Sequence, residues 1–118
     1  MDLSESFEPI RKAVQQRNLP GVEECLSYGT PAFKVRGKLL LRLREPDVVV
    51  LPCEIEEKDF LKQMGPDVYF ETDHYAGYPW ILAYVSRIDL EDLADRVQMA
   101  WRGYASRKMV DDFDSRNG

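Results

Sequence analysis

Apolar residues recur every three or four positions near both ends of the chain, which predicts an amphipathic helix at each end. The first helix covers residues 7–17, with Ser6 as its N-cap, because Pro9 is tolerated only in a first turn. Its apolar face is formed by Phe7, Ile10 and Val14. The last helix begins after Asp89, and its apolar face is formed by Leu90, Leu93, Ala94, Val97, Trp101 and Tyr104. A shorter helix is predicted over residues 55–64.

The middle of the chain changes to an alternating pattern, which is typical of half-buried β-strands. Apolar side chains take the odd positions of segment 33–44, so we predict two strands joined by a turn at residues 36–38. Three further strands are predicted over residues 48–51, 68–71 and 80–85. The pattern indicates a single α+β domain, a five-stranded antiparallel sheet with the N- and C-terminal helices packed on one face. We assign residues 1–110 to this domain and residues 111–118 to a frayed, polar, acidic tail.

The composition is that of a globular protein. The chain has 118 residues, of which 44% are hydrophobic and 31% charged, and a mainly disordered chain would be poorer in apolar residues. The longest uncharged apolar run, residues 48–53, is far shorter than the roughly 20 residues of a membrane helix. The first residues lack the basic and apolar parts of a secretion signal. We therefore expect a cytoplasmic protein with no membrane partner.

The chain offers few residues for metal or nucleophilic chemistry. A closed zinc site takes four Cys or His ligands, whereas only Cys25, Cys53 and His74 are present, so a site would have to borrow a carboxylate. Both cysteines are interpreted as small core hydrophobes in a reducing compartment. No glycine-rich phosphate loop, G-x-S-x-G or H-E-x-x-H motif occurs. We expect a non-enzymatic protein without metal or cofactor.

Two blocks of sequence point to a known family. The first reads Leu-Pro-Gly-Val-Glu-Glu at 19–24 and Tyr-Gly-Thr-Pro-Ala-Phe-Lys-Val-Arg-Gly-Lys at 28–38, and the second reads Pro-Asp-Val-Tyr-Phe-Glu-Thr-Asp-His-Tyr-Ala-Gly-Tyr-Pro at 66–79. Together they resemble the MmcQ/YjbR family over about residues 7–110. The resemblance implies a frataxin-like (CyaY-like) fold. It also implies DNA binding, because the family is commonly described as binding DNA through a double-wing arrangement.

The net charge of −5 hides one basic segment that suits this expectation. Residues 31–45 carry a net charge of +4, whereas the rest of the chain carries −9. The basic residues of the segment are Lys34, Arg36, Lys38, Arg42 and Arg44. Their even numbers predict one shared face of the hairpin, from which they would bind a phosphate backbone weakly and in a salt-sensitive way. The alternative is a charged outer face that only keeps the sheet soluble.

Aromatic residues form a second candidate site, for a small molecule or a protein. The candidate residues are Tyr28, His74, Tyr75, Tyr78 and Trp80. Binding pockets are commonly lined by aromatic rings with a few polar groups. Histidine is the residue type whose unperturbed pKa lies near neutrality, which makes His74 the acid–base candidate. Lys34 or Arg36 would anchor an anionic ligand. The alternative is that these rings pack a turn and that His74 bonds to a backbone carbonyl.

Overall fold

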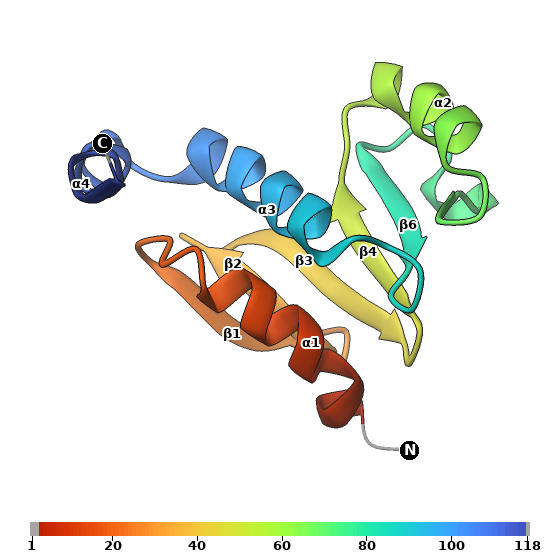
Figure 1. The fold of residues 1–118 in the computed structure, drawn as a ribbon, viewed down its shortest axis with the longest axis horizontal. Coiled ribbons are helices and arrows are strands. Elements are labelled where there is room, and N and C mark those ends of the chain that lie inside the picture. The colour runs from red at the N-terminus through yellow and green to blue at the C-terminus, as the bar shows by residue number, and fades with distance from the viewer. Residues whose placement is uncertain (1–2, 118) are drawn as a thin grey trace.

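The computed structural model describes residues 3–117, and within them the chain forms a six-stranded antiparallel sheet with four α-helices (Figure 1). The strands lie in the order β1-β2-β3-β4-β6-β5. Their bounds are β1 (Val22–Ser27), β2 (Thr30–Val35), β3 (Lys38–Glu45), β4 (Val48–Pro52), β5 (Tyr69–Phe70) and β6 (Trp80–Tyr84). The helices are α1 (Leu3–Gln15), α2 (Ile55–Met64), α3 (Leu90–Tyr104) and α4 (Arg107–Asn117), with a short 3₁₀ helix η1 (Asp73–Tyr75). The α+β prediction is confirmed.

Helices α1 and α3 cover one face of the sheet, which we call the helix face (Figure 1). The main core lies there. It includes Phe7 and Ile10 of α1 and Trp101 of α3, each 0% exposed. The indole N–H of Trp101 donates to the Pro20 carbonyl at 2.7 Å, so this ring is buried without losing its hydrogen bond. Within residues 3–117, no helix has both the length and the apolar character needed to cross a bilayer.

The opposite face of the sheet, which we call the open face, carries a second and smaller core. Val48, Val50, Tyr75 and Leu82 are buried there. Because Val49 and Leu51 are buried on the helix face, strand β4 is apolar on both sides, as is usual for a strand covered on both faces. The segment that brings Tyr75 over the open face is the loop between β5 and β6.

The sheet has one strand more than the five predicted, because β1 was not recognised. Glu23 and Glu24 make this strand polar, with no run of alternating apolar residues. It lies at the sheet edge, where only one neighbouring strand is needed and exposed charges are common. Glu24 also contacts the helix face, where Arg11 of α1 binds its carboxylate and lowers its pKa.

The first helix begins at Leu3, so the predicted N-cap at Ser6 and the predicted start at residue 7 are wrong. Pro9 lies inside the helix and not in its first turn. Its missing N–H removes one backbone hydrogen bond at most. The burial of Phe7 and Ile10 on either side of the proline outweighs this loss.

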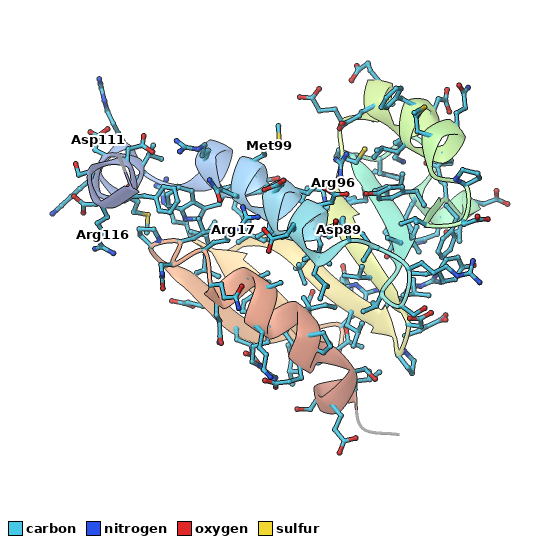
Figure 2. The ribbon with its side chains drawn as sticks, in the orientation of Figure 1. Arg17, Asp89, Arg96, Met99, Asp111 and Arg116 are labelled. Carbon is cyan, nitrogen blue, oxygen red and sulfur yellow. The ribbon has the colours of Figure 1, made fainter. Side chains whose placement is uncertain are left out.

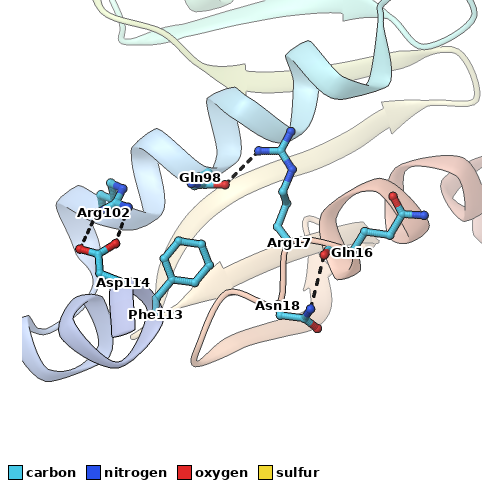
Figure 3. Close-up of a pocket in the computed structure, with 7 residues that line it drawn as sticks. All are labelled: Gln16, Arg17, Asn18, Gln98, Arg102, Phe113 and Asp114. Atoms are coloured by element: carbon cyan, nitrogen blue, oxygen red, sulfur yellow. Dashed lines mark hydrogen bonds and ion pairs between the residues drawn. The ribbon is translucent and has the colours of Figure 1, made fainter. Parts of the chain in front are cut away.

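Within the segment 111–118 that we assigned to a frayed polar tail, residues 111–117 belong to α4, and Gly118 lies outside the residues that the structure describes. Figure 3 shows how α4 is held against α3. Phe113 is 6% exposed and packs edge-to-face with Trp101, with the two ring centres 5.1 Å apart. Asp114 forms an ion pair with Arg102 at 2.7 Å, which lowers the pKa of this carboxyl. One buried ring and one ion pair therefore order an otherwise polar segment.

Candidate functional site: an arginine–aromatic pocket

A pocket of about 630 Å³ opens on the open face, within the size range of small-molecule sites. We call it the arginine–aromatic pocket. It is lined by Tyr28, Leu39, Arg42, Val50, His74, Tyr75, Tyr78 and Trp80. All five residues of the predicted aromatic site thus come together, joined by one arginine of the basic segment. None of these described lining residues is acidic, although the chain as a whole carries a net charge of −5.

Tyr28 reaches the pocket from the turn between β1 and β2. The turn residues Tyr28 and Gly29 have φ values of +53° and +78°, the left-handed conformation that two-residue hairpin turns need. Asparagine or glycine normally takes the first of these positions, and a bulky side chain there is strained. The tyrosine ring is 90% exposed, so packing does not explain its presence. Strain of this kind is often found at functional sites.

Arg42 forms the polar wall of the pocket. Its Nη1 donates to Thr30 Oγ1 at 3.0 Å, and its Nη2 donates to the Tyr75 hydroxyl at 3.4 Å. The guanidinium lies 5.2 Å from the centre of the Tyr28 ring. An arginine has five N–H donors, so these contacts fix the group and leave others for a ligand. Among residues 3–117, no carboxylate forms an ion pair with Arg42.

The loop between β5 and β6 supplies the other rings. Tyr75 is only 9% exposed and anchors the loop, with the Arg44 guanidinium 6.0 Å from its ring centre. The exposed His74 ring stands edge-on to Tyr75 at 4.8 Å. No hydrogen bond from the His74 ring to a carbonyl is found within the described chain, in contrast to the packing alternative. Tyr78 is 60% exposed at the mouth of the pocket.

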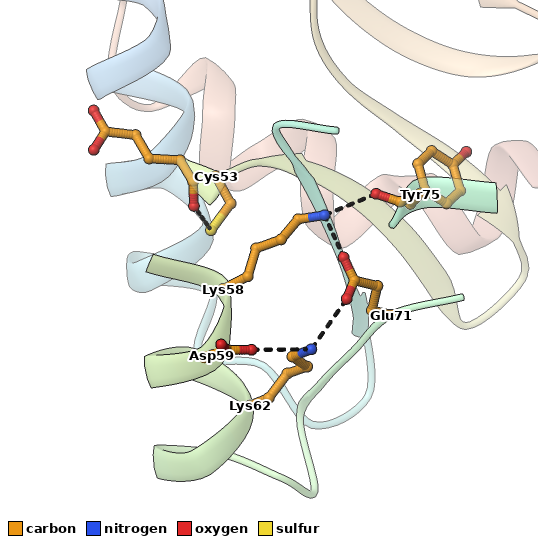
Figure 4. A network of polar contacts seen from close by, with 7 residues as sticks. Cys53, Lys58, Asp59, Lys62, Glu71 and Tyr75 are labelled. Atoms are coloured by element: carbon orange, nitrogen blue, oxygen red, sulfur yellow. Dashed lines mark hydrogen bonds and ion pairs between the residues drawn. The ribbon is translucent and has the colours of Figure 1, made fainter. Parts of the chain in front are cut away.

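A buried ion-pair network holds this loop from behind (Figure 4). Lys58 of α2 is 3% exposed, and its Nζ donates to the Tyr75 carbonyl at 2.8 Å and to Glu71. Lys62 donates to the other Glu71 oxygen at 3.0 Å. The two lysines lower the pKa of Glu71 by hydrogen bonding and charge, and Glu71 raises the pKa of Lys62. The position of Tyr75 therefore depends on α2.

Sequence reasoning missed Lys58, Glu71 and Thr30. Lys58 lies three residues before the buried Leu61, and this i, i+3 spacing on one helix face was the available signal. The pairing of Glu71 with α2 had no local signal. The apolar wall of the pocket includes Leu39 and Val50, which were interpreted only as strand residues.

The five basic residues of segment 31–45 do not share one face, so that prediction is wrong. Arg36 and Lys38 lie on the helix-face side, where Arg36 Nη1 donates to the Tyr104 carbonyl at 3.2 Å and Lys38 lies 6.0 Å from the Tyr104 ring centre. The remaining three, Lys34, Arg42 and Arg44, belong to the open face.

A β-bulge explains this division. Phe33 pairs with Leu41, but Lys34 pairs with Leu39, so Leu40 is an extra residue on β3. The extra residue reverses the alternation of side chains along the strand. Lys38 consequently lies opposite the buried Val35 and shares its face.

Among residues 3–117, no hydrogen bond joins either cysteine to His74. Cys53 is 5% exposed, and burial raises the pKa of its thiol to about 11, so it is protonated near neutrality. Cys25 is half-buried on β1. Among residues 3–117, no group of three His, Cys, Asp or Glu side chains is placed to hold a metal ion.

Comparison with known proteins places the chain in a family. The YjbR family model matches residues 17–103, which include every residue of the arginine–aromatic pocket but not α4. Uncharacterized proteins of Mycobacterium tuberculosis and Mycobacterium bovis are each 36% identical over 53 residues, which is 45% of this chain and 41% of the relative. The match thus spans less than half the length of these curated relatives. On the strength of the family match, the chain belongs to the YjbR family.

Proposed function

We propose that the arginine–aromatic pocket binds an anionic small molecule with a planar ring, of the mononucleotide type. The observation that carries the proposal is that five aromatic side chains and one guanidinium without a carboxylate partner meet in a single pocket of about 630 Å³, whose described lining contains no acidic residue. Aromatic side chains stack on nucleobases at about 1–3 kcal/mol per base. A guanidinium binds phosphate through paired, charge-assisted hydrogen bonds.

The charges around the pocket support an anionic ligand. Lys34, Arg42 and Arg44 lie on the open face, and none of them forms an ion pair with a carboxylate among residues 3–117. The described lining of the pocket therefore carries a positive charge although the chain carries −5 overall. Arg42 is already fixed by Thr30 and Tyr75, so binding costs little side-chain entropy.

Replacing Tyr28 by asparagine should separate binding from stability. Asparagine tolerates φ of +53° better than tyrosine, and the ring is 90% exposed, so little packing is lost. We expect the free energy of unfolding to stay equal or to rise by up to about 1 kcal/mol. The affinity for a mononucleotide should fall about tenfold, because one stacking surface is lost. Urea denaturation and a binding titration measure the two effects.

Arg36→Asn is the matched control. Arg36 takes the same place in the next hairpin turn, with φ of +52° followed by Gly37 at +79°, but it does not line the pocket. It should relieve the same strain and leave the affinity unchanged. Equal losses of affinity in the two variants, or none in Tyr28→Asn, would contradict the role given to Tyr28.

Duplex DNA binding by the hairpin is the second candidate function. The observation in its favour is that all five basic residues of segment 31–45 lack a carboxylate partner within the described chain. These residues divide between two faces of the sheet, so one duplex would contact only one of two groups. The first group is Lys34, Arg42 and Arg44, and the second is Arg36 and Lys38. A footprint of two or three phosphates gives weak binding.

Fluorescence anisotropy with a short duplex at two salt concentrations tests this candidate. Each phosphate contact should contribute about −0.9 to the slope of log K against log salt, so three contacts predict a slope near −3. The pair Lys34→Ala and Arg44→Ala reports on the open face, and the pair Arg36→Ala and Lys38→Ala on the hairpin tip. Absence of binding at low salt, or binding untouched by both pairs, would remove DNA as a ligand of the hairpin.

A further inference from the structure

Exposed apolar side chains gather at a second place, away from the arginine–aromatic pocket. Of the seven large hydrophobic residues exposed within residues 3–117, four belong to α2 and α3. They are Ile55 at 50%, Phe60 at 59%, Met64 at 71% and Met99 at 74% exposure. Met64 and Met99 line cavities between the two helices, and exposed apolar residues that meet in this way mark an interaction surface, whereas isolated ones are ordinary.

A groove runs between these two helices. Two cavities of about 640 and 350 Å³ share Glu57, Arg96 and Met99, so they adjoin along the groove. The ion pair between Arg96 of α3 and Glu57 of α2, at 3.1 Å, spans the groove where the two cavities adjoin. Figure 1 shows α2 standing apart from α3, and Figure 2 shows Met99 projecting from α3 away from the sheet. We call this feature the α2–α3 groove.

The walls of the groove are apolar and adaptable. Met64 lies at the α2 side, and Met99, Ala100 and Gly103 lie along α3. A Cβ atom added at Gly103 would meet nothing within 4 Å, so the α3 wall is open there. Methionine is flexible and polarisable, and methionine-rich grooves accept the apolar faces of helices.

The rim of the groove is acidic. Glu54 and Glu56 line the larger cavity, Asp92 lines the smaller one, and all three are exposed. None of the three forms an ion pair with another residue of segment 3–117. Glu57 and Arg96 neutralise each other, so the rim keeps a net negative charge. Its electrostatic complement is a basic surface.

We propose that the α2–α3 groove binds a basic amphipathic helix of a partner protein. The apolar face of that helix would lie against Met64 and Met99, and its lysine or arginine side chains would meet Glu54, Glu56 and Asp92. Helix α3 has 15 residues and is therefore about 22 Å long, which suits a bound helix of about four turns. The groove shares no lining residue with the pocket on the open face, so substitutions at the groove leave the lining of the pocket intact.

A labelled peptide of about 15 residues, made of leucine and lysine in an amphipathic helical order, tests the proposal against the full chain. A peptide of the same composition with the two residue types shuffled is the control for charge alone. We expect the amphipathic peptide to bind at least about tenfold more tightly than the shuffled one. The double variant Met64→Ser, Met99→Ser should remove that advantage, and Glu54→Gln with Glu56→Gln should weaken its salt dependence.

Leu26→Ser is the matched variant outside the groove, since Leu26 is 68% exposed on β1. It should bind like the wild type. Because Met64 and Met99 are exposed, their variant should keep its melting temperature, so loss of binding is not loss of fold. Equal binding of the two peptides, or full binding by the methionine variant, would overturn the proposal. So would a homodimer, seen by sedimentation equilibrium, that the methionine variant dissociates, because a second copy would then occupy the groove.

Discussion

Replacing Glu71 by alanine should lower the free energy of unfolding by about 3 kcal/mol near neutral pH. The variant leaves the Lys58 ammonium, which is 3% exposed, without its carboxylate partner. A buried charge that has lost its partner costs more than the intact pair contributes, because its hydration is not restored. Lys62 also loses its contact at 3.0 Å, but it is more exposed and adds less. Urea denaturation of the two proteins measures the difference.

The effect should depend on pH in a definite direction. The two lysines lower the pKa of Glu71 in the folded state below its ordinary value of 4.5. The network therefore stabilises the fold above that value, and this contribution is lost as the pH falls through the folded-state pKa. The difference between wild type and Glu71→Ala should shrink steadily as the pH is lowered from about 5 toward 3.

Lys58→Met is the control for this first prediction. Methionine fits the path of the lysine stem, and Glu71 keeps Lys62 as a partner, so the loss should be less than half of that in Glu71→Ala. Equal losses in the two variants would show that packing, and not an unpaired charge, dominates at this site. A pH-independent difference would exclude the ion pair as the cause.

Replacing Arg42 by glutamine should lower the affinity for a mononucleotide about 30-fold or more. The variant removes the arginine that lines the pocket, and hydrogen bonds to charged groups contribute about 1.5–3 kcal/mol each. Arg42→Lys should recover only part of the affinity, because an ammonium cannot form two parallel bonds to phosphate. Isothermal titration of both variants gives the comparison.

Arg44→Gln is the matched control, since Arg44 lies two residues further along the open face but does not line the pocket. It should weaken binding by less than about threefold, through long-range charge alone. If Arg42→Gln and Arg44→Gln lose affinity equally, the open face attracts anions without a specific site. That result would contradict the role of the pocket.

The sequence allowed prediction of those elements whose pattern is local. The alternation over residues 33–44 predicted β2 and β3, and the spacing from Leu90 to Tyr104 predicted α3, because a strand or helix with one buried face shows its period directly. Strand β1 was missed because Glu23 and Glu24 obscure the period at an exposed edge. The C-terminal part of α4 was missed because Phe113 is a single buried ring among the polar residues 111–116.

The candidate site was predictable only where its residues are neighbours in sequence. His74, Tyr75 and Tyr78 lie on one loop, so their proximity followed from the sequence. Arg42 was grouped with the hairpin cations, because the bulge at Leu40 that divides them depends on strand pairing. The Lys58–Glu71 network joins α2 to the loop through tertiary packing, and nothing local in either segment indicates it.

The most direct test of ligand binding by the arginine–aromatic pocket is a ¹H–¹⁵N NMR titration with AMP, read at the two tryptophan indole signals. Trp80 lines the pocket, whereas Trp101 is 0% exposed with its indole N–H bound to Pro20, and so serves as an internal reference. Adenosine and ribose 5-phosphate, each carrying half of the ligand, are titrated alongside. Ligand binding by the pocket predicts a saturable shift of the Trp80 signal at millimolar AMP or below, an unmoved Trp101 signal, and affinities at least about tenfold weaker for either half of the ligand. An unmoved Trp80 signal, or ribose 5-phosphate binding as tightly as AMP, would contradict it.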